Sequence, residues 1–221
     1  MQKPIVISLF DLTGESVQPW ADAGYGCHVI DTQHVDGDLR ENVRAHNLDL
    51  LNTTPEDILC SIKCYNRKVA FISAFPPCDH LAVSGARWFK GKGLRALADS
   101  IHLFATAAEF CDASGAPYYI ENPVSTISTY WRKPDFSYHP WQYSGLEPAD
   151  CYKKRTCLWT GGGFNMPEPN CAPDCQPDDR IHKAAPGPDR KNFRSATPAG
   201  FAQAVFLANA PRHITLPKLR N

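Results

Sequence analysis

A cysteine and a glutamate each follow an apolar run that is typical of a buried strand. Residues 69–75 lead into two prolines and Cys78, and residues 118–120 lead directly into Glu121. Proline has no amide donor for a β-ladder and disfavours helix in the residue before it, so the first strand must end at the prolines. A thiol is a nucleophile once it is deprotonated, and a carboxyl group can act as a general acid or base. The pair therefore predicts nucleophilic attack assisted by proton transfer.

Polar residues also follow the first two predicted strands. Those at the first strand end are Phe10, Asp11, Thr13 and Gly14. Asp31 follows the second strand, where an acidic residue typically binds a pair of ribose hydroxyls. A glycine in a strand-to-helix turn lets a ligand approach the backbone, and the helix amides favour polar or anionic groups. Neither the dinucleotide fingerprint nor a Walker loop is present, so this joint placement predicts a cofactor site of another kind.

The elements that must position these residues alternate along the chain. The predicted strands are residues 5–10, 27–30, 46–51, 69–75, 118–120 and 156–159. The predicted helices are residues 16–22, one beginning at Pro55 with Thr54 as its cap, one with a buried face from Leu97 to Cys111 ending at Gly115, and one beginning at Thr197-Pro198. Residues 84–93 and 161–192 are predicted loops. This alternation is typical of an α/β protein with a doubly wound, mostly parallel sheet.

Composition limits the class of protein without identifying it. The chain has 221 residues, of which 43% are apolar, as in one large domain or one domain with a small lobe. The formal net charge is zero, which argues against a strongly basic coat for nucleic acid but leaves room for a local basic cleft. No segment approaches the roughly 18 to 20 apolar residues of a membrane span.

The nine cysteines are an odd number, and no apolar leader precedes the first strand. We therefore predict reduced thiols and a cytoplasmic location rather than a disulfide framework. No membrane partner is expected, and a monomer is favoured.

Several segments, in order, resemble the motifs of DNA (cytosine-5)-methyltransferases. They are residues 10–14, Asp31, 75–78, 121–123, 153–155 and 194–198. The resemblance is closest to short members from phages and mobile elements, whose phrases are similar to residues 19–25 and 82–87. It spans most of the chain, and the order of Pro-Pro-Cys and Glu-Asn is its most specific part. It implies a Rossmann-like, class I S-adenosylmethionine-dependent methyltransferase fold with a central, mostly parallel sheet flanked by helices and a small, loop-rich second lobe.

The resemblance implies a covalent mechanism on DNA. Cys78 would attack carbon 6 of cytosine while Glu121 protonates ring nitrogen 3, and carbon 5 would then accept methyl from S-adenosylmethionine, leaving S-adenosylhomocysteine. A target base in duplex DNA must first be flipped out. The location would be the cytosol of a bacterium or of a phage-infected host. The implied catalytic residues are Cys78, Glu121 and Arg155.

The remaining site residues divide between cofactor and substrate. The expected cofactor contacts are Phe10, Asp11, Thr13, Gly14, Asp31, Asp49, Phe75, Pro76 and Ser195. The expected substrate contacts are Ser84, Arg87, Lys90, Lys92, Asn122 and Lys153, and the cations Arg87, Lys90, Lys92 and Arg155 would favour the Cys78 thiolate. No metal is expected. Cys151 and Lys153 stand where the family's glutamine and first arginine would be, and lysine lacks arginine's bidentate fork.

The family's large target-recognition domain has no counterpart of comparable length here. Only a short segment separates Trp159 from Arg194. The expected division is a cofactor-binding and catalytic core at residues 1–125, a reduced substrate lobe at 126–193, and a C-terminal helix at 194–221 that returns to the core. Low sequence specificity, or readout by residues 84–95 and the aromatic stretch at 130–143, would follow.

Other functions remain as alternatives. The same carbon 5 chemistry could act on single-stranded DNA or a nucleotide, or use a modified donor. A non-catalytic homologue could bind zinc through Cys171, Cys175 and His182, joined by Cys151 or Cys157, or could bind DNA alone. An amino-group methyltransferase is disfavoured by Phe75 and Cys78 around the prolines. A zinc deaminase is excluded because no second thiol follows Cys78 at the required spacing.

Overall fold

The computed structural model describes residues 4–62, 67–183 and 194–211. Within these residues, eight strands form one sheet in the order β3-β4-β2-β1-β5-β6-β8-β7. The strands are β1 (Ile5–Leu9), β2 (Gly26–Ile30), β3 (Gly37–Arg40), β4 (Val43–His46), β5 (Val69–Ala74), β6 (Tyr118–Pro123), β7 (Phe136–Tyr138) and β8 (Thr156–Gly161).

The pairing of the strands identifies the fold class. Strands β4, β2, β1, β5 and β6 run parallel to one another, and β8 lies antiparallel between β6 and β7. An open parallel sheet whose last strand is inserted in reverse is the arrangement of Rossmann-like class I methyltransferases, which confirms the predicted fold class. The short β3 pairs antiparallel with β4 and adds an outer edge to this sheet.

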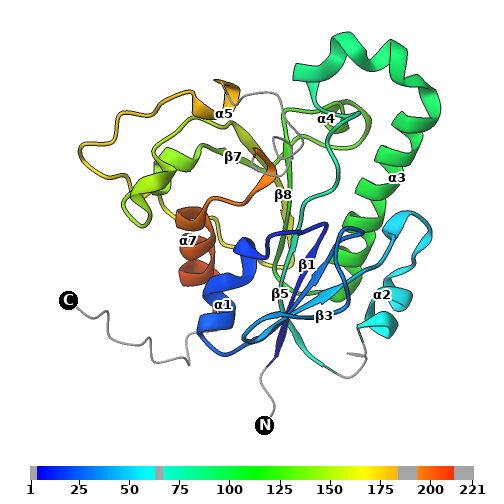
Figure 1. Cartoon of the computed structure of the whole chain (residues 1–221), viewed down its shortest axis with the longest axis horizontal. Coiled ribbons are helices and arrows are strands. Elements are labelled where there is room, and N and C mark those ends of the chain that lie inside the picture. The colour runs from blue at the N-terminus through cyan, green and yellow to red at the C-terminus, as the bar shows by residue number, and fades with distance from the viewer. Residues whose placement is uncertain (1–3, 63–66, 184–193, 212–221) are drawn as a thin grey trace.

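Helices cover both faces of the sheet (Figure 1). Helices α1 (Gln18–Asp22) and α7 (Ala199–Asn209) lie on one face, and α2 (Pro55–Ser61) and α3 (Phe89–Ser114) lie on the other. The shorter helices are α4 (Ile127–Tyr130), α5 (Arg180–Lys183) and the 3-10 turns η1 (Glu15–Val17), η2 (Leu50–Asn52), η3 (Val83–Trp88), η4 (Pro140–Tyr143) and η5 (Pro148–Asp150). Each face has its own core, with Trp20 and Phe201 in one and Phe104 and Trp159 in the other. The sheet is therefore buried on both sides, as its apolar strands require.

Local sequence signals explain several boundaries. Thr54 caps α2 through a capping box with Asp57, and Pro55 occupies the first helical position, as predicted. Gly115, with a φ of 63°, ends α3 in the left-handed region where glycine is favoured. The predicted buried face of α3 is confirmed, because Phe104 and Cys111 are fully buried.

Three predicted elements are wrong. The strand expected at 46–51 is instead β4, three residues earlier, and Asp49 caps the turn η2 that follows it. Residues 84–93 are not a loop: they form η3 and the start of α3, with a break in helical geometry at Gly93. The N-cap of the last helix is Pro198 rather than Thr197, and its side chain cannot accept a hydrogen bond. The glycines of residues 84–93 favour a loop because each lowers helix propensity by about 1 kcal/mol, and the rest of α3 overrides that cost.

The prediction that the thiols are all reduced is also wrong. Cys151 and Cys175 form a disulfide that joins the segment before β8 to the loop after it. The zinc alternative loses the Cys175 thiolate in this oxidised form, and Cys171 instead donates weakly to the carbonyl of Gln142. No group of three or more metal-binding side chains occurs among the described residues. Sequence could not identify the pair because connectivity does not follow from cysteine spacing.

In the part of the chain that the structure describes, no helix is both long enough and apolar enough to cross a bilayer. Strands β7 and β8, which fall within the predicted substrate lobe at 126–193, complete the same sheet as β1 to β6. The division of the chain into three units stays a prediction.

Candidate active site

The loops after β5 and β6 are fastened to each other at the carboxyl ends of the strands. The Asn122 side-chain amide donates to the carbonyl of Pro76 at 2.9 Å. The amide of Val83 donates to the carbonyl of Val124, and the amide of Thr126 donates to the carbonyl of Leu81. These bonds hold the turn that carries Cys78 against the segment that follows Glu121. The structure therefore brings together the two residues that the sequence predicts as nucleophile and acid.

Burial sets the protonation of Cys78. Loss of water around the half-buried side chain is the largest effect, and the nearby Glu121 and Asp79 carboxylates add to it, raising the pKa of Cys78 to about 11. The cation of Lys154 acts in the opposite direction. The thiol is therefore protonated at neutral pH, and its reaction as a nucleophile requires that a neighbouring group accept the proton.

Glu121 is the nearest candidate for that proton. Burial raises the pKa of its carboxyl group, and the Lys154 cation lowers it. Lys154 also donates to the carbonyl of Ala196 at 3.4 Å, which ties it to the segment before α7. The three side chains form a group in which one cation moderates two acids whose anions repel each other.

Sequence reasoning missed Lys154 and chose its neighbours. Arg155 is exposed, and its charge acts on His139 and Cys157 rather than on Cys78 or Glu121. Lys153 is exposed and pairs with Asp179 at 3.9 Å. Successive residues of an extended segment point to opposite sides, which separates Lys154 from both neighbours. The side that Lys154 takes depends on the Glu121–Leu158 register across β6 and β8, a long-range contact that the sequence does not reveal.

Four buried polar atoms close to these loops have no hydrogen-bond partner among the described residues. They are Asn122 Oδ1, His80 Nδ1, Ser125 Oγ and Thr126 Oγ1. Buried polar atoms are normally paired, and a group of unpaired ones is typical of a place where a ligand or water completes the hydrogen bonds. They therefore mark the surroundings of Cys78 and Glu121 as a binding region rather than as packed core.

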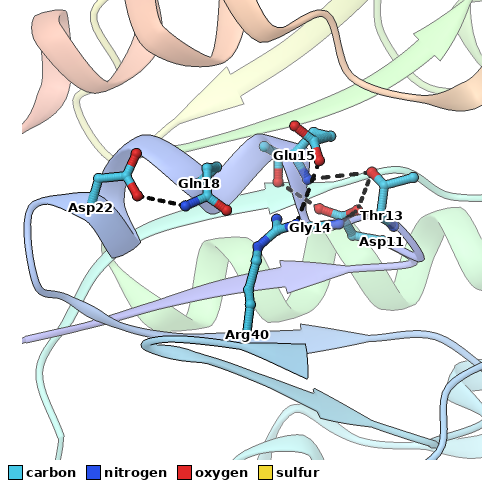
Figure 2. A network of polar contacts seen from close by, with 8 residues as sticks. Asp11, Thr13, Gly14, Glu15, Gln18, Asp22 and Arg40 are labelled. Carbon is cyan, nitrogen blue, oxygen red and sulfur yellow. Dashed lines mark hydrogen bonds and ion pairs between the residues drawn. The ribbon is translucent and has the colours of Figure 1, made fainter. Parts of the chain in front are cut away.

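The Asp11 carboxylate organises the turn after β1 (Figure 2). One oxygen accepts from the amides of Thr13 and Gly14, at 3.1 and 2.7 Å. The other accepts from the hydroxyls of Ser8 and Ser16, at 2.8 and 2.6 Å. Asp11 is thus predicted correctly as part of the first strand end, but its oxygens hold the turn and are not free for a ligand.

Gly14 continues that turn with a φ of 69°, a conformation that residues with a Cβ rarely adopt. The space beside it is filled by Arg40, whose Nη2 would lie 2.8 Å from a Cβ at this position. Figure 2 shows the Arg40 side chain reaching this turn from β3, and its guanidinium pairs with Glu15 at 3.5 Å. The glycine is therefore required by the protein's own packing.

Asp31 fits a cofactor better than Asp11. It lies at the end of β2, and its Oδ1 accepts from the amide and side chain of Gln33. Its Oδ2 has no partner among the described residues, which leaves an acceptor at the position that typically receives ribose hydroxyls. Phe10 lies at the neighbouring strand end with a φ of 57° and contributes a half-buried ring. Asp31 therefore offers an acceptor, and Phe10 an apolar ring, at neighbouring strand ends.

The other residues expected to contact the cofactor are Phe75, Pro76, Asp49 and Ser195. Phe75 and Pro76 connect β5 to the Cys78 turn, and the Phe75 amide donates to the carbonyl of Leu9 at 3.0 Å. Asp49 is exposed and accepts from the amide of Leu51. Ser195 is exposed and precedes Ala196, whose carbonyl binds Lys154.

Four of the six expected substrate residues lie on one segment, residues 84–92, whereas Asn122 lies on β6 and Lys153 lies before β8. Ser84, Arg87 and Lys90 are exposed on η3 and the start of α3, and the Arg87 guanidinium lies 5.1 Å from the centre of the Trp88 ring. Lys92 donates to the carbonyl of Asp79 at 2.5 Å, beside Cys78.

Comparisons with known proteins give no family for this chain. No family model matches the sequence, and no curated protein matches it. Among solved structures, the chain is similar to an E. coli prophage protein described as a candidate DNA modification methyltransferase, with a TM-score of 0.47 and 14% identity. The similarity covers 72% of this chain and 46% of that chain, so the present chain corresponds to less than half of the prophage protein.

Proposed function

We propose that the protein is a DNA methyltransferase that transfers methyl from S-adenosylmethionine to carbon 5 of cytosine through a covalent Cys78 adduct. One observation carries this proposal: Cys78 follows β5, and Glu121 lies near the carboxyl end of the neighbouring parallel strand β6, in one electrostatic group with Lys154. Ligands of open α/β sheets bind at the carboxyl ends of the strands, which is where these residues lie.

The protonation states favour a coupled attack. Burial is the main reason that the pKa of Cys78 is high, and the Glu121 anion adds to it. Passage of the thiol proton to the Glu121 carboxylate would remove that anion. The Cys78 sulfur would bond to carbon 6 of cytosine, and the Glu121 proton would be delivered to ring nitrogen 3. The electron pair of the former 5,6 double bond then makes carbon 5 nucleophilic. After methyl transfer, a water molecule would take the carbon 5 proton and Cys78 would leave as the thiolate, which restores the 5,6 double bond. The proton on ring nitrogen 3 would then return through Glu121 to the thiolate, so that neutral 5-methylcytosine and the starting protonation states are recovered.

The cofactor's contribution when bound is an electrophilic methyl group on a sulfonium. The residues suited to hold it are Asp31, through its unpartnered Oδ2, and the Phe10 ring at the neighbouring strand end. Asp11, Thr13 and Gly14 would keep the intervening turn in shape. Phe75 and Pro76 would set the spacing between this region and Cys78.

The DNA substrate is supported by the reactive pair and by the basic segment before α3. Cytosine must leave the base stack to reach a half-buried thiol, at an unpairing cost of a few kcal/mol that is smallest in single strands. The exposed cations Arg87 and Lys90 would contact phosphates near the target base.

Replacement of the nucleophile tests the covalent scheme. Cys78→Ser should reduce methyl transfer by at least about a thousandfold, because a serine hydroxyl is a far weaker nucleophile than a thiol at the same place. The measurement is transfer of labelled methyl to cytosine-containing oligonucleotides. Cys60→Ser, at an exposed cysteine on α2, is the matched control and should keep full activity. Full activity in Cys78→Ser would reject the scheme.

A mechanism-based substrate tests the same step independently. DNA that contains 5-fluorocytosine should remain bonded to Cys78, because fluorine cannot leave carbon 5 as a proton does. Denaturing electrophoresis should show a covalent protein–DNA band that needs the cofactor and is absent in Cys78→Ser. Turnover on cytosine without any such band would contradict attack by the cysteine.

A further inference from the structure

A cavity of about 350 Å³ lies beside the Cys78 turn, at the break in α3. Its apolar walls come from Phe89, Leu94 and Leu97, and its polar groups come from His80, Lys90 and Lys92. Small-molecule sites commonly combine apolar walls with a few placed polar groups, and this volume is in their usual range. The cavity is therefore the right size for one nucleotide and has chemically distinct sides.

The segment that forms the cavity is strongly basic in a chain of zero net charge. Residues 87–95 contain four cations and no carboxylate: Arg87, Lys90, Lys92 and Arg95. The same segment exposes large apolar side chains, with Trp88 at 61% and Leu94 at 84% exposure. Cations interleaved with exposed aromatic and apolar side chains are typical of surfaces that bind single-stranded nucleic acid.

The cavity is directly connected to the nucleophile's turn. His80 lines it two residues after Cys78, and its Nδ1 is buried without a hydrogen-bond partner among the described residues. Lys92 lines it too, and its ammonium group donates to the carbonyl of Asp79. A ligand in the cavity would thus lie next to whatever base occupies the Cys78 site.

We propose that this cavity binds the nucleotide adjacent to the target cytosine. Its base would leave the DNA stack and pack against Phe89 and Leu97, and its phosphate would contact Lys90. The unpartnered Nδ1 of His80 is available to the edge of that base. The inference rests on the proposed function for the identity of the polymer, and it deepens that function: the substrate is single-stranded or locally opened DNA, since two adjacent bases must leave the stack.

The first experiment does not depend on methyl transfer. Ligand-observed NMR with dAMP, dGMP, dCMP and dTMP should detect binding of nucleotides to the protein. Lys90→Gln should weaken it about five- to tenfold and Phe89→Ala about tenfold, because each removes one side of the cavity. Lys133→Gln removes an equally exposed cation outside the cavity lining and should leave binding unchanged. Equal losses in Lys90→Gln and Lys133→Gln, or no nucleotide binding at all, would overturn the proposal.

The second experiment uses pentanucleotides with a central cytosine. An abasic site is placed on one side of the cytosine or on the other. On the side whose nucleotide the cavity binds, it should weaken binding about tenfold in the parent protein and much less in Phe89→Ala. An abasic site on either side without effect, or equal affinity for fully paired duplex, would overturn the cavity's role. Nucleotide binding that follows this pattern without any methyl transfer would instead reject the proposed function and leave the cavity assignment standing.

Discussion

Lys154 is the residue on which the electrostatics of the site converge. Burial raises the pKa of Cys78, of Glu121 and of Asp150, and the Glu121 anion also raises that of Cys78. The Lys154 cation lowers the pKa of all three groups. A single lysine therefore offsets three buried or half-buried acids. Its hold on the Ala196 carbonyl also connects this charge balance to the start of the last helix.

Removing this cation should change the pH dependence of the proposed reaction. In Lys154→Gln, the pKa values of Cys78 and Glu121 both rise, so a smaller fraction of either is ionised at a given pH. We expect methyl transfer at pH 7 to fall about tenfold and the acidic limb of the pH–rate profile to move to higher pH. Rates measured from pH 5 to pH 9 test this.

Lys153→Gln is the matched control for that measurement. Its side chain is half exposed and pairs with Asp179 at the surface, so the pH–rate profile should be unchanged. A profile that moves equally in both variants would mean that general positive charge, and not the position of Lys154, sets the acidic limb.

At this scale, sequence was informative where chemistry depends on strand ends. Cys78 and Glu121 were chosen as candidates because prolines and apolar runs indicate the ends of β5 and β6, although β6 continues through Glu121 to Pro123. Lys154 was not, because three consecutive cations give no indication of which one faces the sheet's polar crevice. That choice depends on the register between β6 and β8, which is a long-range contact.

Helix α7 depends on a buried acid at its beginning. The Gly200 amide donates to Asp150 Oδ2 at 2.8 Å, and a Cβ on Gly200 would lie 2.5 Å from the carbonyl of Tyr143. Burial raises the pKa of Asp150 to about 6, although this hydrogen bond and nearby cations act against it. The start of α7 can therefore approach the turns η4 and η5 closely because a glycine and a buried carboxyl group meet there.

The stability of the protein should decrease as this carboxyl group ionises. Its pKa is about 6 in the folded protein and about 3.9 when unfolded, so the folded state binds more protons between these values. The contribution is fully present below pH 4 and is lost as pH rises through 6. Asp150→Asn should match the parent near pH 4 and be more stable at pH 7 by about 1 to 3 kcal/mol. Urea unfolding at both pH values tests it, and identical pH slopes would contradict it.

Element boundaries were predictable where a single residue fixes them and not where neighbours do. Thr54 and Gly115 act through their own backbone or side chain, and both predictions are confirmed. The prediction misplaced β4 because Val-Arg-Ala-His alternates only weakly between apolar and polar residues. These residues form a strand because they pair with β2 on one side and with β3 on the other. The start of α3 was missed because glycines predict a loop more strongly than the helix behind them predicts a continuation.

The disulfide connects parts of the molecule that the sheet does not. Cys151 precedes β8 and Cys175 lies in the long loop after it, at a sequence separation of 24. Cross-linking a loop of this length lowers the entropy of the unfolded chain by an amount equivalent to about 3 kcal/mol at 25 °C. The same bond lies three residues from Lys154 and so constrains the segment that supplies the site's cation.

Removing the bond should lower stability and leave the fold intact. Cys175→Ser is expected to lose about 2 to 4 kcal/mol in urea unfolding under oxidising conditions. Under strong reductant the parent should fall to the level of the variant. Cys171→Ser, at the neighbouring free cysteine, serves as control and should behave like the parent. If Cys175→Ser and Cys171→Ser are equally stable, the cross-link is absent from the protein in solution.

Strand β8 enters the sheet against the direction of β6, immediately after the basic residues 153–155. Successive residues of an extended chain point to opposite sides. An insertion or deletion of one residue ahead of β8 would therefore exchange Lys154 for another lysine or for an arginine, and Glu121 would still meet a positive charge. A run of three cations therefore tolerates a change of one residue in loop length and still keeps a positive charge beside Glu121.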